Sequence, residues 1–192
     1  MTRLDLAYTA HTLAKFGDNP GPEHRKAVMK ALQCLKRTAS LGVTYEGATE
    51  DVMKLSVWVD ADHARCLDTP RSVSGGAVML DGESISLFLR AQRVTTTAMS
   101  ESDYVALAEI ANKLRFLWQV KAFMAPLIDC NNRVHEDTED AIKMAENRFS
   151  SRRRRHIDVK HHMVRDAVDG GIPDVEYFKS GEQRADVLTK AI

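Results

Sequence analysis

Four aspartates lie where strands or helices are predicted to begin or end, and these residues are the ones best suited to chemistry. In chain order they occupy the end of a strand, the first turn of a long helix, the end of a short strand and the last helix, at Asp60, Asp103, Asp137 and Asp186. The carboxyl ends of strands are where sheets covered by helices tend to build their sites. One such acid is unremarkable, but four in one small domain point to a shared site.

Carboxylates gathered at one point would suit the in-line hydrolysis of a phosphodiester bond. This reaction uses one cation to hold and deprotonate the attacking water and a second cation, about 3.5–4 Å away, to stabilise the leaving oxygen. Mg²⁺ prefers oxygen ligands and keeps some of its waters, so a few carboxylates suffice to hold it. Because the four carboxylates would repel one another without cations, we predict that the site depends on metal.

The elements that must position these acids can be predicted from periodicity and turn residues. Within residues 1–46, apolar residues at helical spacing on either side of a Gly- and Pro-rich breaker at residues 17–22 predict two short helices. Residues 47–54 are interpreted as a linker, and residues 55–192 as one further domain.

In residues 55–192 the pattern predicts three strands in a row, a long helix, and then alternating shorter elements. The predicted strands cover residues 55–60, 73–80, 84–90, 133–135 and 175–178, and the predicted helices cover residues 100–124, 138–147, 155–168 and 183–190. Asp81 and Gly82 form a tight-turn pair between the second and third strands. The order indicates an α/β fold, in which an antiparallel meander continues into parallel strands and helices cover both faces.

Composition narrows the class of protein without naming a function. Of the 192 residues, 44% are hydrophobic and 28% are charged, as in ordinary globular proteins, and the net charge is zero. The cysteines, Cys34, Cys66 and Cys130, form no CxxC pair, which favours free thiols in a reducing compartment. No apolar run approaches the roughly 18 residues of a membrane helix, so no membrane partner is expected.

Five stretches resemble, in order, motifs of the ribonuclease H domain of copia-type retrotransposon Pol polyproteins. Residues 59–62 and 71–76 resemble its Asp-Ala-Asp-Trp and Arg-Lys-Ser-Thr-Ser-Gly stretches, and residues 97–107 resemble Ser-Thr-Glu-Ala-Glu-Tyr-x-Ala-Leu. Residues 155–165 are similar to Lys-His-Ile-Asp-Val-Arg-Tyr-His-Phe-Val-Arg, and residues 185–190 match Ala-Asp-Ile-Leu-Thr-Lys. The resemblance extends to residues 1–46, which are similar to the end of the preceding reverse transcriptase and are expected to contribute no catalysis.

The resemblance implies a ribonuclease H-like fold, with a five-stranded mixed sheet flanked by helices and a short N-terminal helical appendage. It implies a metal-dependent endonuclease that hydrolyses the RNA strand of RNA–DNA hybrids during reverse transcription, with two Mg²⁺ ions for which Mn²⁺ can substitute. Carried over to this sequence, Asp60 would bridge both ions and Asp103 would take the place of the family's glutamate. Asp137 would be the third acid, and Asp186 the fourth, near the ion that activates water.

The resemblance also implies partners. These are the RNA–DNA hybrid and the remainder of the Pol polyprotein, including the reverse transcriptase and the integrase. The location would be intracellular, in the cytoplasm, a virus-like particle or the nucleus. A basic run precedes one of the motifs, and it is either solvated surface or a set of phosphate contacts that position the duplex, formed by Arg152, Arg153, Arg154, Arg155 and His156.

Two departures from the family pattern concern the acids themselves. The helix position expected to hold glutamate is Asp103, which is one methylene shorter, and Glu101 is the other candidate for the helix carboxylate. The family's Cys-Asp-Asn around the third acid reads Glu136, Asp137 and Thr138. These departures leave an alternative open, a catalytically decayed remnant that folds and binds duplex nucleic acid. A related integrase or resolvase nuclease would share the acids but not the ending at residues 185–190.

Overall fold

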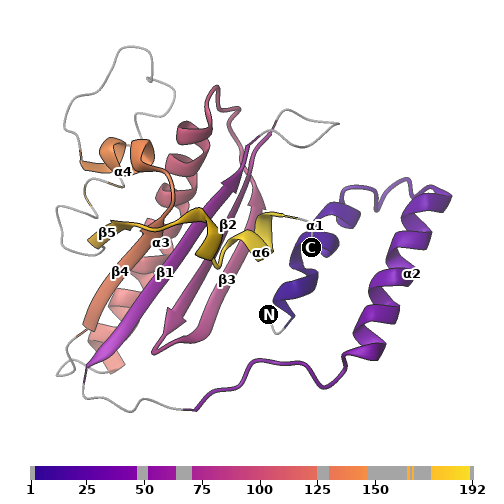
Figure 1. Cartoon of the computed structure of the whole chain (residues 1–192), viewed down its shortest axis with the longest axis horizontal. Helices are drawn as coiled ribbons and strands as arrows, with labels where there is room; N and C mark the ends of the chain where they lie inside the picture. Colours follow the sequence, from indigo (N-terminus) through magenta and orange to yellow (C-terminus); the bar gives the residue numbers. More distant parts are fainter. Residues whose placement is uncertain are drawn as a thin grey trace.

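The computed structural model describes residues 3–46, 52–63, 71–124, 130–146, 164, 166 and 174–190. These residues form a five-stranded sheet with helices against both of its faces (Figure 1). The strands are β1 (Met53–Asp62), β2 (Val73–Leu80), β3 (Glu83–Ala91), β4 (Cys130–Glu136) and β5 (Asp174–Tyr177). The helices are η1 (Leu4–Leu6), α1 (Ala7–Ala14), α2 (Pro22–Arg37), α3 (Met99–Met124), α4 (Glu139–Glu146), η3 (Ser180–Glu182) and α6 (Asp186–Thr189).

The sheet has the strand order β3-β2-β1-β4-β5 and mixes both directions of pairing. β1, β2 and β3 pair antiparallel, whereas β4 runs parallel to β1 and β5 runs parallel to β4. The predicted meander followed by parallel strands is therefore confirmed, as is the α/β fold class. At the β2–β3 turn, Asp81 and Gly82 both have positive φ, of 51° and 89°, which is why this two-residue connection needs such a pair.

The two faces of the sheet are covered by different helices because side chains alternate along a strand. Val57, Val59 and Ala61 of β1 are buried in a core cluster with α3 and α4, which lie on one face. Trp58 has the opposite parity and packs with Leu188 of α6 on the other face. In Figure 1, α6 crosses one face of the sheet and α3 lies behind the other.

The close fit of α6 on β2 depends on a residue with no side chain. A Cβ atom added to Gly75 would lie 2.6 Å from Cγ2 of Thr189, which is too close for a real contact, and 3.2 Å from Cβ of Leu188, which is tight. Gly75 pairs with Asp60 across the β1–β2 ladder. The glycine therefore allows α6 to approach the sheet directly beside Asp60.

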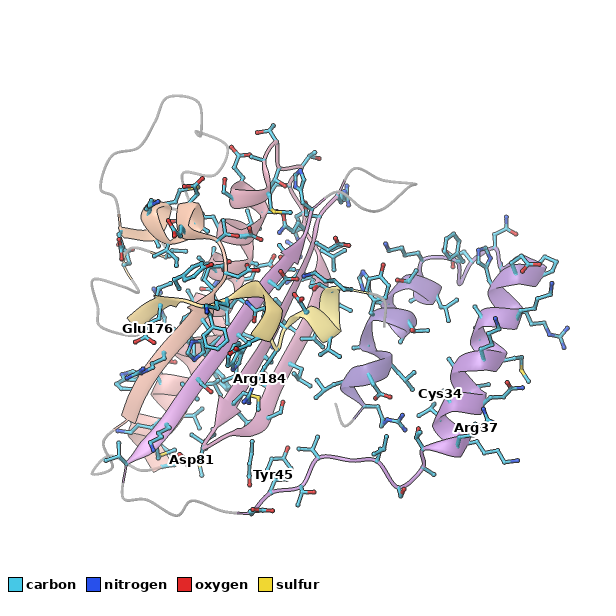
Figure 2. The ribbon with its side chains drawn as sticks, viewed as in Figure 1. Cys34, Arg37, Tyr45, Asp81, Glu176 and Arg184 are labelled. Carbon is cyan, nitrogen blue, oxygen red and sulfur yellow. The ribbon has the colours of Figure 1, made fainter. Side chains whose placement is uncertain are left out.

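The N-terminal helices lie beside the sheet, at its β3 side (Figure 1). α1 contacts β3 and α6, whereas the only substantial contacts of α2 with another element of the described residues are those with α1. Figure 2 shows Tyr45, in the segment after α2, near the β2–β3 turn, where its hydroxyl donates to the carbonyl of Ser84 at 2.8 Å. Of the helices in the described segments, none has the length and apolar character that crossing a bilayer requires.

Several predicted bounds differ from the structure or fall outside it, and β4 in particular spans Cys130–Glu136 instead of residues 133–135. β1 begins at Met53, so the last residues of the expected linker belong to the strand. The last helix, predicted over residues 183–190, is shorter and spans only Asp186–Thr189. The reason is that the side chain of Gln183 donates to the carbonyl of Val59 at 2.9 Å, which holds this residue against β1. The helix predicted over residues 155–168 lies almost entirely outside the described residues.

Candidate active site

A cavity of about 530 Å³ opens where β1 and β4 end and α3 begins. Because β1 and β4 are parallel neighbours, their carboxyl ends meet at the same edge of the sheet. Asp60 near the end of β1, Asp103 near the start of α3 and Asp137 directly after β4 all line this cavity. The fold thus brings together three of the four acids that the sequence singled out.

Asp60 is buried and is held by the C-terminal segment of the chain. It is 5% exposed, and its Oδ2 accepts a hydrogen bond from the hydroxyl of Thr189. Burial raises the pKa of the Asp60 carboxyl above its ordinary value, while the bond from Thr189 and the nearby ammonium group of Lys190 lower it. The charged form of Asp60 therefore depends on groups from α6 and from the residue that follows it.

Asp103 is a second buried acid, and its pKa is strongly raised. It is 2% exposed, and its Oδ2 accepts a hydrogen bond from the hydroxyl of Thr138 at 2.7 Å. Burial, together with the nearby carboxylates of Asp60 and Asp137, raises the pKa of Asp103 to about 7, against the lowering effect of Thr138. At neutral pH this carboxyl binds a proton about half the time when no cation is present.

Glu101, the other candidate for the helix carboxylate, has a different role in the structure. Its Oε2 accepts hydrogen bonds from the backbone N–H and the hydroxyl of Thr97, both at 2.8 Å. These bonds satisfy donors at the N-terminal end of α3, where a carboxylate also interacts favourably with the helix dipole. Glu101 does not line the cavity, whereas Asp103 does.

Asp186 is placed beside the cavity instead of in its lining. Its Oδ1 accepts a hydrogen bond from Nζ of Lys190 at 2.5 Å, and it is Lys190 that lines the cavity. Burial acts to lower the pKa of Lys190, and the contacts with Asp186 and Asp60 outweigh it, so that the pKa lies above its ordinary value. The side chain of Lys190 is therefore protonated and lies between two of the four predicted acids.

Glu136 is a further acid at this site that the sequence reasoning missed. It ends β4, is fully buried, and has one oxygen, Oε2, without a hydrogen-bond partner in the described part of the chain. Burial, with additional repulsion from Asp103 and Asp137, raises the pKa of Glu136 well above its ordinary value. The only signal in the sequence was an acid two positions after Val134, on the strand face that alternation assigns to the core.

The balance of charge around the cavity favours a cation. Six of the residues that line it are acids, namely Asp60, Asp62, Asp103, Asp137, Glu139 and Asp140. The basic residues among the described lining are Lys190 and His63. Carboxylate oxygens are the donors that Mg²⁺ prefers, so the donor set fits this ion. Among the described residues, however, no three histidine, cysteine or acidic side chains lie close enough together to hold a metal as they stand.

The predicted nucleic-acid contacts lie outside the described residues. They are Arg152, Arg153, Arg154, Arg155 and His156.

His63 lies at the edge of the cavity, where its Nδ1 is 3.4 Å from the hydroxyl oxygens of Ser72 and Thr96. The described rim of the cavity therefore carries little positive charge of its own apart from Lys190.

Comparisons with known proteins find relatives that match the whole chain. No family model matches it. It is 29% identical over 195 residues to the retrovirus-related Pol polyprotein from transposon TNT 1-94 of Nicotiana tabacum, and 25% identical over 197 residues to that from transposon RE1 of Arabidopsis thaliana. Both matches cover 100% of this chain but only 14% and 13% of those polyproteins.

The fold agrees with a solved ribonuclease H structure. The N-terminal RNase H domain of rv2228c from Mycobacterium tuberculosis, solved as a fusion with maltose binding protein, matches with a TM-score of 0.50 and 12% identity. The match covers 71% of this chain and 91% of that one. Over its whole length the chain is thus similar to copia-type retrotransposon Pol polyproteins, and its described residues have a ribonuclease H-like fold.

Proposed function

We propose that this region is a metal-dependent endonuclease that hydrolyses the RNA strand of RNA–DNA hybrids during reverse transcription. The observation that carries the proposal is the convergence of Asp60, Asp103 and Asp137 from separate elements on one cavity. The acidic lining of the cavity supports a cation-dependent reaction, because these carboxylates raise one another's pKa when no cation offsets their charge.

Asp60, Asp103 and Asp137 would hold the cations, with Asp186 as a fourth acid beside them. Two bound Mg²⁺ ions, or Mn²⁺ in their place, would supply a water-derived nucleophile and stabilise charge on the leaving oxygen. Because ligands bind cations in their deprotonated form, the raised pKa of Asp103 makes cation affinity depend on pH near neutrality.

The residues around Asp60 have a supporting role in this proposal. Thr189 donates to Asp60, and Lys190 lies within reach of both Asp60 and Asp186. Together they oppose the rise in the pKa of Asp60 that burial causes, and the bond from Thr189 orients its carboxylate. The C-terminal segment thus supports Asp60 and also supplies Asp186 beside the site.

The substrate is proposed to be recognised by charge and shape. Arg152 to Arg155 and His156 would contact phosphates and so position the duplex without reading its sequence. The RNA strand would be distinguished by its 2′-hydroxyl groups, which DNA lacks. A location inside the cell, in the cytoplasm, a virus-like particle or the nucleus, belongs to the same proposal.

We further propose that residues 1–46 belong to the end of a reverse transcriptase and that residues 55–192 form the nuclease unit. The contacts of α2 support this division, because among the described elements they are substantial only with α1. None of residues 3–46 lines the acidic cavity. The rest of a Pol polyprotein, including its reverse transcriptase and integrase, is the proposed protein partner.

A second candidate is a decayed remnant that folds and binds duplex nucleic acid without cleaving it. The observation that favours it is the spacing of the acids, since no three of them in the described residues already surround one point. Asp103 adds to this, because it has a shorter reach than the glutamate of the family pattern. Misplacement of catalytic groups by about 1 Å can cost on the order of a hundredfold in rate.

Incubation of the purified chain with strand-labelled duplexes would decide between the two candidates. The proposed function predicts that the RNA strand of an RNA–DNA hybrid is cut in Mg²⁺ or Mn²⁺, that double-stranded DNA is not, and that EDTA stops the reaction. A folded chain that retains the hybrid in a binding assay, but cuts neither strand in either metal, would favour the remnant.

A further inference from the structure

Two of the positions at which the acidic site departs from the family pattern are in direct contact. The hydroxyl of Thr138 donates to Oδ2 of Asp103 at 2.7 Å, although the residues are 35 positions apart in the chain. Asp103 stands where the pattern has glutamate, and Thr138 stands where it has asparagine. A shorter acid and a hydroxyl that reaches it therefore occur together.

Thr138 is itself held firmly between β4 and α4. Its backbone N–H donates to Oε1 of Glu136 at 3.3 Å. Its carbonyl accepts bonds from the N–H groups of Ala141 at 3.0 Å and Ile142 at 3.2 Å, in the first turn of α4. With its backbone fixed on both sides, Thr138 presents its hydroxyl to Asp103 from a rigid position.

We propose that Thr138 is a positioning residue that holds the short carboxylate of Asp103 in the orientation needed to bind a cation in the acidic cavity. The inference rests on the proposed function, since it assigns a supporting residue to the same site. Mg²⁺–oxygen distances are confined to about 2.0–2.1 Å, so a carboxylate with less reach tolerates less misorientation. Partners that orient a metal-binding carboxylate typically change metal affinity by about 10- to 100-fold when they are removed.

Charge acts in the same direction as geometry. Burial and the nearby carboxylates of Asp60 and Asp137 oppose the ionisation of Asp103, and the buried carboxyl of Glu136 lies close to it. The bond from Thr138 favours the charged carboxylate. Loss of the hydroxyl would leave the carboxylate of Asp103 less well oriented toward a cation.

Calorimetric titration of the full chain with MnCl₂, in the absence of nucleic acid, tests this role. Thr138→Val keeps the shape of the side chain and removes the hydroxyl, and we expect it to weaken Mn²⁺ binding by about 10- to 100-fold. Thr138→Ser restores the hydroxyl and should restore the affinity. Thr44→Val makes the same change at an exposed residue outside the cavity lining and should leave the affinity unchanged.

The outcomes separate this inference from the function on which it rests. If the wild-type chain binds Mn²⁺ and folded Thr138→Val binds it with the same affinity, the positioning role is overturned. The proposal of a metal site is then unaffected. A folded wild-type chain that binds no Mn²⁺ would overturn both. If Thr138→Val does not fold, Thr138→Ala removes the same hydroxyl with less bulk and carries the same expectation. A purely structural threonine would lower thermal stability in these variants without changing the Mn²⁺ affinity.

Discussion

The hydroxyl of Thr189, in the last described helix, donates a hydrogen bond to the buried carboxylate of Asp60, 129 positions earlier in the chain. This bond joins α6 to β1 at the edge of the acidic cavity. It is one of two interactions that lower the pKa of Asp60 against the effect of burial, and the other is with the ammonium group of Lys190.

Replacement of Thr189 by valine should destabilise the chain. The valine fits the same space but leaves Oδ2 of Asp60 without this donor, and a buried acceptor that loses its partner costs about 1–3 kcal/mol. The midpoint of urea unfolding at pH 8 measures the effect. Thr189→Ser, which keeps the hydroxyl, is the matched control, and a valine variant as stable as the wild-type chain would show that the bond is not important for folding.

The pKa of Asp103 predicts how stability depends on pH in the absence of metal. Its folded value of about 7 lies above the ordinary 3.8, so the folded state holds a proton that the unfolded state has released. The contribution of Asp103 is therefore fully favourable below about pH 4 and is lost as the pH rises to about 7. Because each tenfold change in proton affinity is about 1.4 kcal/mol, the loss should amount to a few kcal/mol.

Urea unfolding in EDTA across this pH range provides the check. Asp103→Asn carries no ionisable group but can still accept the bond from Thr138, so its unfolding free energy should change less steeply with pH. Asp18→Asn, at an exposed turn, should follow the wild-type curve. Equal slopes for the wild-type chain and Asp103→Asn would contradict the raised pKa.

Glu136 is expected to be replaceable without loss of stability. Burial raises the pKa of the Glu136 carboxyl well above its value in the unfolded chain, and this difference in proton affinity disfavours folding above the ordinary pKa. Glu136→Gln has the same shape and removes this difference, so the variant should be at least as stable as the wild-type chain at pH 8. Thermal unfolding in EDTA measures it, and a large loss of stability would mean that Glu136 is charged in the folded state.

The close approach of α6 to Gly75 predicts that a larger residue at this position destabilises the chain. A Cβ atom there would lie 2.6 Å from Cγ2 of Thr189, so Gly75→Ala must push α6 away from β2. Overpacking of this kind typically costs about 1–3 kcal/mol. Denaturant unfolding measures the loss. Combination with Thr189→Ser, which removes the methyl group that clashes, should recover part of it, and no recovery would place the strain elsewhere.

Much of the fold was predictable because its signals are local. Strand alternation and the Asp81-Gly82 turn located β1, β2 and β3, and an acid at the end of a strand could be recognised from its position alone. Asp60, Asp103 and Asp137 were found in this way, and the structure brings them to one cavity.

The remaining features depend on contacts between distant residues. No local pattern could show that Thr138 reaches Asp103, or that Lys190 and not Asp186 would line the cavity. The last helix was predicted too long because the side chain of Gln183 binds the carbonyl of Val59, 124 positions away. Such bonds are set by the packing of α6 and the segment before it on the sheet, which becomes visible only when the chain is folded.

Cleavage of the RNA strand by the wild-type chain and by Asp60→Asn tests the central claim most directly. Single-turnover reactions with an end-labelled RNA–DNA hybrid and Mn²⁺ would be compared with Asp18→Asn as the control for loss of a single acid. The account predicts metal-dependent cleavage of the RNA strand alone by the wild-type and control chains, and none by Asp60→Asn. Equal cleavage by Asp60→Asn, or cleavage that persists in EDTA, would contradict it.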